Sequence, residues 1–564
     1  MPLTGAQIAV AMLQAYQVRH LFGVPGDTSL AFYDALCQAG GWIQHILARD
    51  ERSAAFMADV YARVSFRPGV CEAPSGAGAT YLAGGLAEPH ASSIPVVALT
   101  SDTPLSQDDR NVLTALDQLA LFAPITKWRT RVQSAGRVSD AIRMAFRQAT
   151  SGRAGAAVVV LPMDILSQTV EDPLLHADPV CSTYPAYPTR PDPAAVERAA
   201  DLLARAERPA IVAGGGVVCA QAWDELAALA EALGAPVGTS ICGKGAIAED
   251  HPLSLGVVGG NGGRPYANAY LQRADLILYV GCKTDSVTTA GWTRPPLRAA
   301  PTIVQLDADP AEVGRNCPIA AGLVGDARLG LADLLEALRA RKVRPREGLL
   351  AGLEGARKAF WDEFAARAAD GSRPIKPQRV IRLLGELLPR DSIVVADAGT
   401  PTPFTAAYYP SPAGRHVIIP RGYGGLGYAI PGVLGAKLAR PEATVVGLMG
   451  DGSFAMSAGE LETVSRLSLP VTLIQFNNAC FGWIKTAQQL ECAGRTFGVD
   501  FSADTDYAAI ARGFGLEGIR VEDPAALEPA LRQALGSERP TFVDVVSACE
   551  VDELPPVEKW RREP

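Results

Sequence analysis

The residues best suited to chemistry follow two apolar segments in the C-terminal part of the chain. Gly450-Asp451-Gly452-Ser453 comes after the apolar run 444–449, and Asn477-Asn478 comes after the run 471–476. Apolar, β-branched runs of this length predict buried parallel strands. A strand that ends in glycines exposes backbone N–H groups beside one carboxylate, which suits a phosphate with a bound divalent cation. Hard oxygens from Asp451 and the Asn478 amide suit Mg²⁺.

These residues need a scaffold that brings the two strand ends together. A helix expected over 457–467 joins the two predicted strands. In an open α/β sheet, this connection places both carboxyl ends at the edge where ligands bind. The alternative is a glycine-rich turn and an Asn pair that only cap a strand and a helix.

The two motifs together resemble the signature of thiamine-diphosphate (ThDP) enzymes, in which Gly-Asp-Gly is followed after roughly thirty residues by Asn-Asn. Asn478 lies 27 residues after Asp451. The resemblance implies that both side chains bind the metal and that the backbone carbonyl of Cys480 is the third protein ligand. It also places Gly450, Gly452 and Ser453 beside the cofactor diphosphate.

Three segments near the amino terminus resemble, in order, the pyrimidine-binding domain of the acetolactate synthase, pyruvate oxidase and 2-oxo-acid decarboxylase group. They are residues 20–27, 48–63 and 74–80. In that group a glutamate at the start of the alanine-rich helix contacts the aminopyrimidine ring of ThDP, and the resemblance transfers this role to Glu51. This glutamate stabilises the imino tautomer, so that the cofactor removes its own C2 proton. Without the other motifs, Glu51 would be an ordinary acid at a helix N-terminus.

Two further glycine-rich segments are candidates for cofactor contacts. Gly399 and Thr400 follow the apolar residues 394–396 and are candidate donors to the diphosphate. The segment 421–431 is dense in glycine, which permits close backbone approach to a ligand. The resemblance implies that Leu426 holds the cofactor in a bent shape, a core leucine being the alternative. Its neighbours Gly424 and Gly425 are also predicted to contact the cofactor.

Candidates for proton transfer and substrate contact are less distinctive. Pro25 and Gly26 are predicted cofactor contacts in a turn that ends in Asp27. This turn resembles that of pyruvate decarboxylases, whose matching acid contributes to protonation. His90 is a second candidate proton donor, with a surface or capping histidine as the alternative.

The segment after the Asn pair is predicted to line the cofactor and substrate side of the site. Phe481 and Gly482 are candidate cofactor contacts, and Trp483 and Ile484 would form an apolar wall. Lys485 either pairs with a substrate carboxylate or is simply solvated.

Composition restricts the class of protein. The chain has 564 residues, 48% apolar and 20% charged, which is typical of a multidomain globular protein. Its net charge of −8 argues against nucleic acid or an anionic membrane as partner. Ten scattered cysteines without a Cys-x-x-Cys motif, and no apolar run of about 18 residues, favour a reduced cytoplasmic protein without membrane spans.

Alternation of apolar runs and helical segments predicts an α/β protein with three doubly wound, mostly parallel sheets. We expect a pyrimidine-binding domain at 1–175, a central domain at 190–340 and a diphosphate-binding domain at 372–550, with a proline-rich linker after the first. The resemblance covers essentially the whole chain. It implies a homodimer or homotetramer with active sites between subunits.

The predicted function is a ThDP- and Mg²⁺-dependent reaction of a 2-oxo acid, decarboxylation followed by carboligation as in acetolactate synthases. A non-ligating decarboxylase, a 2-hydroxyacyl-CoA lyase, a C–C hydrolase and acyl transfer to phosphate stay open. FAD is not expected, because residues 284–287 depart from the acetolactate synthase pattern and Gly214-Gly215-Gly216 lacks a full dinucleotide fingerprint. A nucleotide-dependent dehydrogenase would need that fingerprint, and a silent homologue would be expected to lose Glu51 or the metal ligands.

Overall fold

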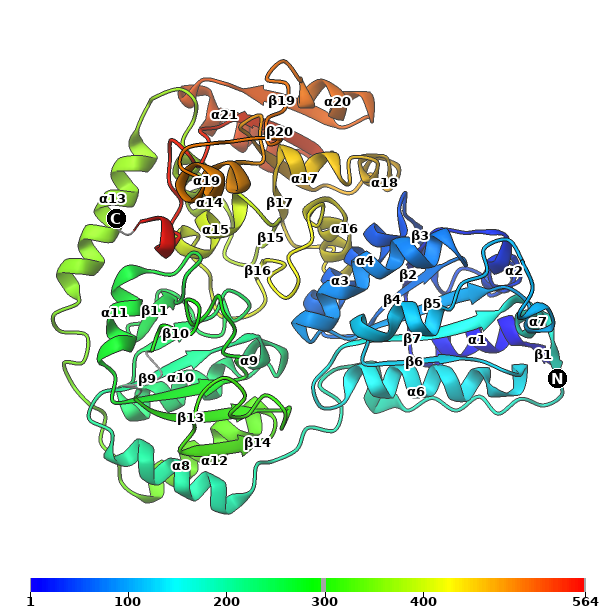
Figure 1. The fold of residues 1–564 in the computed structure, drawn as a ribbon, viewed down its shortest axis with the longest axis horizontal. Coiled ribbons are helices and arrows are strands. Elements are labelled where there is room, and N and C mark those ends of the chain that lie inside the picture. The colour runs from blue at the N-terminus through cyan, green and yellow to red at the C-terminus, as the bar shows by residue number, and fades with distance from the viewer. Residues whose placement is uncertain (1, 296–300, 562–564) are drawn as a thin grey trace. The chain divides into compact units, whose positions relative to one another are not determined.

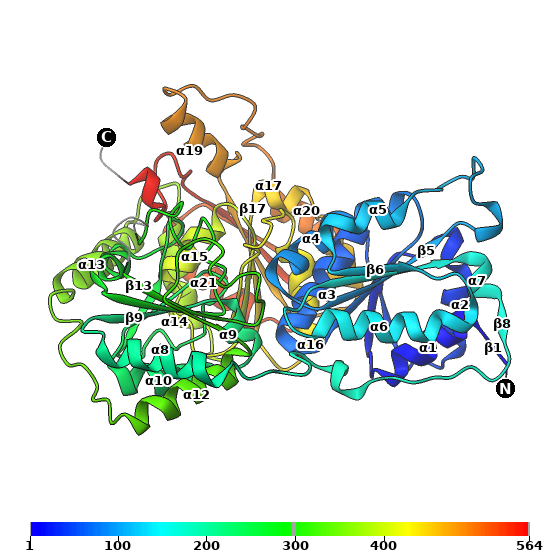
Figure 2. The same ribbon diagram turned by 60° about the horizontal axis from the view of Figure 1, so that its bottom comes forward.

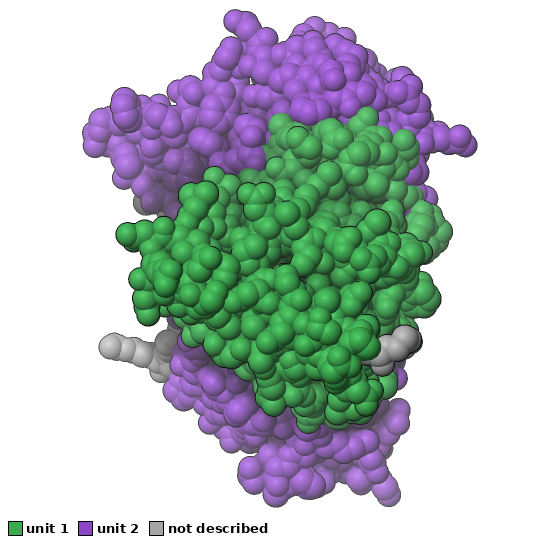
Figure 3. Space-filling view, turned by 90° about the vertical axis from the view of Figure 1, so that its right-hand side faces the viewer, with its two compact units in different colours: residues 1–187, 420–442, 457–469 green, residues 188–419, 443–456, 470–564 purple. Residues whose placement is uncertain are grey.

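The computed structural model describes residues 2–295 and 301–561 and contains three six-stranded parallel sheets (Figure 1). A short antiparallel pair, β1 (Leu3–Thr4) and β8 (Thr169–Val170), stands apart from them. The predicted α/β class with three parallel sheets is confirmed. The chain divides into two compact units, coloured separately in Figure 3.

Unit 1 comprises residues 1–187, 420–442 and 457–469. Its sheet has the order β3-β2-β4-β5-β7-β6. The strands are β2 (His20–Gly23), β3 (Gln44–Leu47), β4 (Gly69–Ala73), β5 (Val96–Asp102), β6 (Trp128–Arg131) and β7 (Ala156–Pro162). Every residue of β7 is buried, because helices cover both faces of a parallel sheet.

The helices of unit 1 pack in two layers. One face of the sheet shares an apolar core with α1 (Gly5–Ala15), α2 (Leu30–Gln38) and α6 (Val138–Thr150). The other face carries α3 (Glu51–Ser65) and α4 (Ala77–Ser92), and α16 (Ala429–Ala439) packs on α3. A Cβ on Gly435 would lie 2.2 Å from the Met57 carbonyl oxygen, so glycine permits this close helix approach. The unit also contains α5 (Gln118–Phe122), α7 (Met163–Ser167) and α18 (Glu460–Arg466).

Unit 2 comprises residues 188–419, 443–456 and 470–564 and contains the other two sheets. The central sheet has the order β11-β10-β9-β12-β13-β14. Its strands are β9 (Pro209–Ala213), β10 (Val237–Thr239), β11 (Ser254–Val257), β12 (Leu276–Val280), β13 (Thr302–Asp307) and β14 (Ala321–Val324). One face packs against α8 (Pro193–Arg205), α9 (Gly215–Cys219), α10 (Trp223–Leu233) and α12 (Ala327–Ala340).

The glycines after β9 have a packing role. A Cβ on Gly214 would lie 2.1 Å from the carbonyl oxygen of Gly281, and one on Gly216 would lie 2.7 Å from the Gly281 Cα. The Gly216 amide also donates to the Gly281 carbonyl oxygen at 3.0 Å. These glycines therefore let the turn pack against the end of the neighbouring strand.

The C-terminal sheet has the order β16-β15-β17-β18-β20-β19. Its strands are β15 (Ile393–Ala396), β16 (Val417–Ile418), β17 (Val445–Gly450), β18 (Thr472–Asn477), β19 (Glu517–Val521) and β20 (Thr541–Val546). β17 and β18 are adjacent and parallel, so their carboxyl ends meet at one edge, as the sequence predicts. Two helices rather than one lie between them in the chain, α17 (Asp451–Ala455) and α18, and they belong to different units.

The two sheets of unit 2 share one apolar core. It includes Ile277 of the central sheet, Leu448 of the C-terminal sheet and Phe360 of α13 (Glu354–Ala369). The aromatic rings of Phe360 and Phe364 stack on Tyr408 in the same core. The remaining helices of the unit are α11 (Pro265–Arg273), α14 (Pro377–Leu387), α15 (Pro401–Tyr408), α19 (Gly482–Glu491), α20 (Tyr507–Gly513) and α21 (Pro524–Leu535). Within the described residues, no helix is both long and apolar enough to span a bilayer.

Candidate functional site

Asp451 is the first residue of α17, at the carboxyl end of β17, and only 2% of its surface is exposed. Its Oδ1 accepts a hydrogen bond from the Gly452 amide at 2.8 Å. Its Oδ2 accepts from the amides of Asn478 at 3.2 Å and Ala479 at 2.7 Å. The backbone that follows β18 therefore fixes the orientation of this carboxylate.

Asn478 is held by a second buried acid that the sequence did not single out. The Asn478 Nδ2 donates to Oε2 of Glu550 at 2.9 Å, and Glu550 is fully buried. The other carboxylate oxygen of Glu550 accepts from the Thr400 hydroxyl. Since the amide nitrogen points to Glu550, the Asn478 Oδ1 is left facing the opposite way, toward Cys480.

Cys480 is buried two residues beyond Asn478. Its amide and its Sγ both donate to the Asn478 Oδ1, at 3.3 and 3.4 Å. Its carbonyl oxygen accepts from the Gly482 amide at 2.9 Å, which leaves one lone pair for another partner. The structure thus connects the three predicted metal ligands by hydrogen bonds at the carboxyl ends of β17 and β18.

The donor set around Asp451 fits a divalent cation. In the described part of the chain, no Lys or Arg forms an ion pair with Asp451 or Glu550, although both carboxylates are buried. Burial raises the pKa of each to about 7. For Asp451, three backbone N–H groups act in the opposite direction. A Mg²⁺ ion would supply the missing positive charge and take hard oxygens from the carboxylate, the amide and the carbonyl.

The described residues contain no cluster of three or more His, Cys, Asp or Glu side chains suited to a metal. A cation bound here would instead use one carboxylate together with an amide and a backbone oxygen, and would need further oxygens from its ligand. Phosphate oxygens commonly complete a Mg²⁺ shell of this kind. The site therefore suits a metal-bound phosphate better than a metal alone.

Glycines shape the cradle beside this donor set. A Cβ on Gly452 would lie 2.5 Å from the Phe481 ring, and one on Gly482 would lie 1.8 Å from the Glu550 Oε2. Gly399 has φ +93° and precedes Thr400 at the start of α15. Together with Gly450 and Ser453 before and within α17, these positions offer backbone N–H groups at two helix starts, where anions bind.

The residues predicted to line the substrate side lie on α19, which projects beyond the sheet of its unit (Figure 2). The Trp483 ring packs on Trp560 with ring centroids 4.4 Å apart. The Ile484 side chain is 48% exposed. The Lys485 Nζ pairs with Asp500 Oδ1 at 2.7 Å, and both side chains are partly exposed.

In unit 1, Glu51 opens α3 at the carboxyl end of β3 and is 7% exposed. Burial raises its pKa, and the neighbouring Asp50 acts in the same direction. A Cβ on Gly78 would lie 2.9 Å from the Glu51 Oε1 and 2.6 Å from the Pro74 ring, so glycine leaves room for the acid. The turn at 25–27 packs against the same proline, because a Cβ on Gly26 would lie 2.5 Å from the Pro74 ring. Pro25 and Asp27 in this turn are exposed.

A second buried acid of unit 1 is electrostatically coupled to Glu51. Glu72 of β4 is 2% exposed and accepts from the Tyr33 hydroxyl at 2.7 Å. The same hydroxyl lies 2.9 Å from the His45 Nε2. Burial raises the pKa of Glu72 to about 8, and the Glu51 charge contributes to this. Burial lowers the pKa of His45 to about 4.

The loop that carries Leu426 is anchored by Glu88 of α4. The buried Glu88 carboxylate accepts from three consecutive amides, those of Gly422 at 3.0 Å, Tyr423 at 2.7 Å and Gly424 at 2.9 Å. Leu426 is half-buried. Gly424 has φ +84°, and Gly425 approaches the ring of Phe56.

His90 lies near the C-terminal end of α4, beside Gly155 and Lys127. Gly78 is at the N-terminal end of the same helix, beside Glu51 of α3. At 1.5 Å per residue, the separation along the axis is on the order of 20 Å. This placement within unit 1 gives no support to His90 as a proton donor beside Glu51.

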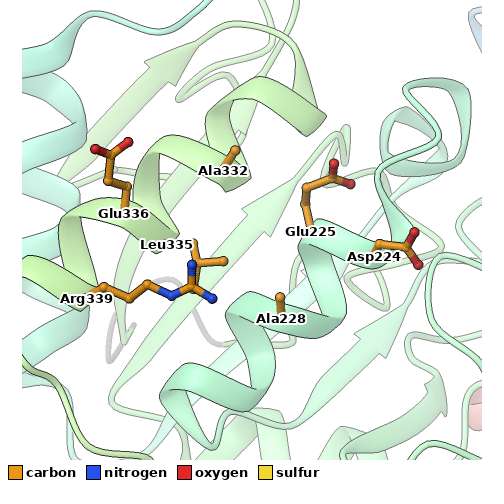
Figure 4. A pocket seen from close by; sticks show the side chains of 7 residues that line it. All are labelled: Asp224, Glu225, Ala228, Ala332, Leu335, Glu336 and Arg339. Atoms are coloured by element: carbon orange, nitrogen blue, oxygen red, sulfur yellow. The ribbon is translucent and has the colours of Figure 1, made fainter.

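A shallow hollow of about 450 Å³ lies between α10 and α12 (Figure 4). It is lined by three acids, one arginine and three apolar residues: Asp224, Glu225, Glu336, Arg339, Ala228, Ala332 and Leu335. Glu225 is already paired with Arg328 at 2.8 Å. The hollow is formed by the sides of helices and not by strand ends, so it is not a typical ligand site of an open α/β sheet.

Glu550 and Glu88 were missed by sequence reasoning. Glu550 lies four residues beyond the end of β20, and an acid at this distance from a strand end only weakly indicates a functional site. Glu88 lies inside an alanine-rich helix with no local feature to mark it. Their partners lie 72 and more than 300 residues away in the chain, which explains why no motif contains them.

Comparison with family models gives three matches, all to thiamine pyrophosphate enzymes. The N-terminal TPP binding domain matches residues 3–121, the central domain 196–338 and the C-terminal TPP binding domain 397–545. The three matches follow the order of the three sheets along the chain and together cover more than half of it.

Curated relatives extend over nearly the whole chain. A probable acetolactate synthase large subunit of Methanocaldococcus jannaschii is 34% identical over 96% of this chain and 92% of its own length. The acetolactate synthase isozyme 3 large subunit of Escherichia coli is 34% identical over 96% and 94%. An acetolactate synthase of Mycobacterium bovis is 32% identical over 98% and 90%.

Proposed function

The chain belongs to the thiamine pyrophosphate enzymes, and from this membership we propose that it decarboxylates a 2-oxo acid with ThDP and Mg²⁺ and joins the acyl fragment to a second carbonyl compound. The observation that carries the proposal is the Asp451–Asn478–Cys480 donor set, with a second buried carboxylate and no ion-paired cation among the described residues. The names of the relatives favour an acetolactate-synthase-like reaction over the other possibilities.

Asp451, Asn478 and the Cys480 carbonyl would hold Mg²⁺, and Glu550 would keep the Asn478 oxygen pointed at it. Gly399 and Thr400, with the Gly450–Ser453 turn, would bind the diphosphate through backbone N–H groups and hydroxyls. When bound, ThDP supplies a thiazolium ring that accepts the electron pair released as CO₂ departs. The protein thus provides charge neutralisation and orientation.

Glu51 would share a proton with a pyrimidine nitrogen of the cofactor. Burial raises its pKa, which favours proton sharing over a permanent charge. Leu426 would support the bent cofactor, and the hydrogen bonds from its loop to Glu88 would hold Leu426 in place. Gly424 and Gly425 would allow the loop to approach the cofactor closely.

Substrate contacts are proposed on both units. Asp27 would contribute to protonation. Pro25 and Gly26, with Phe481, Gly482 and Trp483, would border the cofactor. Ile484 would add apolar surface. The Lys485 side chain is paired with Asp500, so it would reach a substrate carboxylate only by exchanging partners. We do not assign His90 a role in proton transfer.

Two identical subunits would complete each site. We propose that Glu51 of one subunit and Asp451 of its partner serve the same cofactor, which requires at least a dimer. Three domains, at 1–175, 190–340 and 372–550, would form each subunit. Several relatives are described as large subunits, so a smaller partner is a further possibility that size measurements would reveal.

FAD is left out of the proposal, because residues 214–216 lack a full dinucleotide fingerprint and Gly214 and Gly216 have a packing role against Gly281. An absorption band near ~450 nm in the purified protein would contradict this, since flavin redox chemistry is carried by the cofactor itself. All ten cysteines are free in the structure, which agrees with a reducing cytoplasm.

Product analysis by NMR tests the proposed reaction. Purified protein with ThDP and Mg²⁺ is given pyruvate and a series of larger aliphatic and aromatic 2-oxo acids. A coupled ketol such as acetolactate is expected, whereas a free aldehyde would identify a simple decarboxylase. If ThDP binds but no substrate loses CO₂, the proposed reaction is wrong, and acyl-CoA lysis or C–C hydrolysis becomes the better hypothesis.

A further inference from the structure

Two thiols meet beside the proposed metal site. The Sγ atoms of Cys480 and Cys549 lie 3.5 Å apart, and both cysteines are free. Cys480 follows β18 and Cys549 follows β20, and these strands are parallel neighbours. The pairing of Asn477 with Val546 places both loops at the same edge of the sheet. The contact is therefore built by the sheet register and not by an accidental approach of mobile segments.

Each cysteine is next in the chain to a group that positions Asn478. The Cys480 Sγ donates to the Asn478 Oδ1 at 3.4 Å, and its carbonyl is the proposed third metal ligand. Cys549 immediately precedes Glu550, whose carboxylate binds the Asn478 Nδ2 at 2.9 Å. Movement of the two sulfurs would therefore disturb the partners of both polar atoms of the Asn478 amide, Cys480 at Oδ1 and Glu550 at Nδ2.

The pair is accessible from one side. Cys480 is 3% exposed and closed in by its bridge to Asp500, whereas Cys549 is half-buried. A small oxidant can therefore reach Cys549, and Cys480 is the thiol positioned to resolve the oxidised sulfur.

We propose that Cys480 and Cys549 form a reversible disulfide that weakens binding of Mg²⁺ and ThDP. A hydroperoxide would oxidise Cys549 to the sulfenic acid, with the alcohol or water as leaving group. The Cys480 sulfur would then attack, forming the S–S bond and releasing water. The two thiols thus lose two protons and two electrons to the peroxide. A dithiol reductant would reverse the reaction by exchange.

Closure requires only a short movement. A disulfide bond is about 2.05 Å long, so the sulfurs must approach by about 1.5 Å from their 3.5 Å separation. This shift would displace the Cys480 loop and remove the thiol hydrogen that now bonds to Asn478. Because groups that orient metal ligands contribute roughly 10–100-fold in affinity, we expect about tenfold weaker binding after oxidation. This effect rests on the proposed ThDP function, whereas the disulfide itself does not.

The test uses the full-length protein in reduced form and after treatment with hydrogen peroxide. Peptide mapping without reductant is expected to find Cys480 linked to Cys549 and a loss of two free thiols. Calorimetry is expected to show about tenfold weaker Mg²⁺–ThDP binding, restored by dithiothreitol. The matched variants are Cys549→Ser, which should bind ThDP but lose the response, and Cys492→Ser, an exposed cysteine whose removal should leave it unchanged.

The outcomes test formation of the disulfide and its effect on ThDP binding separately. Absence of the linked peptide at a peroxide dose that oxidises Cys492 would overturn the disulfide. A linked peptide with unchanged ThDP affinity would overturn its effect on the site. If the reduced protein binds no ThDP, the proposed function fails and the effect on affinity with it, while the peptide map still decides the disulfide. Cys549→Ala provides a second variant, should Cys549→Ser not fold.

Discussion

Asp451 and Glu51 occupy comparable places in two different sheets, yet their surroundings differ. Each opens a helix at the carboxyl end of a parallel strand, and each is at least nine-tenths buried. Asp451 accepts three backbone hydrogen bonds from Gly452, Asn478 and Ala479. Glu51 lies beside Gly78, and burial raises the pKa of both acids, although three backbone N–H groups oppose this effect at Asp451.

The different surroundings suit the carboxyl groups of Asp451 and Glu51 to different roles. Three fixed N–H donors orient the Asp451 carboxylate and partly oppose the effect of burial on its pKa, which suits a cation ligand. Burial of Glu51 favours the protonated form and suits a group that shares a proton. Substitutions of the two acids are therefore expected to fail in different ways, one in binding and the other in turnover.

The largest effect is expected for Asp451→Asn, which keeps the size of the side chain and removes its charge. Mg²⁺-dependent ThDP affinity should fall at least about 100-fold, because loss of a direct ligand exceeds the effect of losing a supporting group. Calorimetric titration with ThDP and Mg²⁺ measures this affinity. The exposed Asp504→Asn serves as control and should bind normally. Unchanged affinity in Asp451→Asn would remove Asp451 from the metal site.

Glu51→Gln should separate binding from catalysis. ThDP affinity is expected to stay within a few-fold of the original, while kcat falls by about 100-fold or more, the usual contribution of acid–base catalysis. Exchange of the C2 hydrogen of bound ThDP with deuterium, followed by NMR, checks the same step without substrate. The neighbouring helix cap Asp50→Asn is the control. Full turnover by Glu51→Gln would contradict the division of roles.

Glu550→Gln tests whether Glu550 orients Asn478 in the proposed metal site. Glutamine can accept from Asn478 or Thr400 through one oxygen but cannot replace both carboxylate contacts. Mg²⁺ affinity in the presence of ThDP is expected to fall about tenfold. The exposed Asp552→Asn is the matched control. An affinity equal to that of the control would show that Glu550 does not orient Asn478.

The smallest effect concerns Glu72, the second buried acid near Glu51. Its folded-state pKa, raised to about 8, exceeds the unfolded value of 4.5, so the folded protein binds the proton more tightly. Its contribution to stability is therefore complete below about pH 4.5 and is lost as pH rises toward and through 8. Between pH 6.5 and 7.5 the original protein should lose about 1 kcal/mol relative to Glu72→Gln.

Urea unfolding of both proteins at the two pH values measures this difference, with the exposed Glu171→Gln as control. Other titrating groups are common to both proteins and cancel in the comparison. An equal pH dependence in the two proteins would show that Glu72 is ionised throughout this range.

The fold and part of the candidate site follow from local sequence patterns. The apolar runs before Gly450 and Asn477 became adjacent strands, so Asp451 and Asn478 meet as the motif predicts. Periodicity and spacing are sufficient there because each residue directly follows an apolar run that forms a strand, although two helices rather than the predicted one lie between the strands.

Other features depend on side chains far apart in the chain. Glu550 lies 72 residues from Asn478, and Glu88 binds the amides at 422–424 across the unit, so no local pattern contains either pair. Lys485 was expected at a substrate or in solvent, and its partner Asp500 comes from the return of the same loop. His90 lies near the C-terminal end of α4, far along the helix from Gly78, and its role in proton transfer stays a prediction.

The most direct test of the central claim is to mix two inactive variants, Glu51→Gln and Asp451→Asn, after dissociation and reassembly of their subunits. If the two acids of one site come from different subunits, each hybrid dimer has one intact site and one site with both substitutions. Random mixing should then restore about a quarter of the original activity. Absence of activity in hybrids whose formation is shown by native mass spectrometry would contradict the account, because each site would then take both acids from one chain.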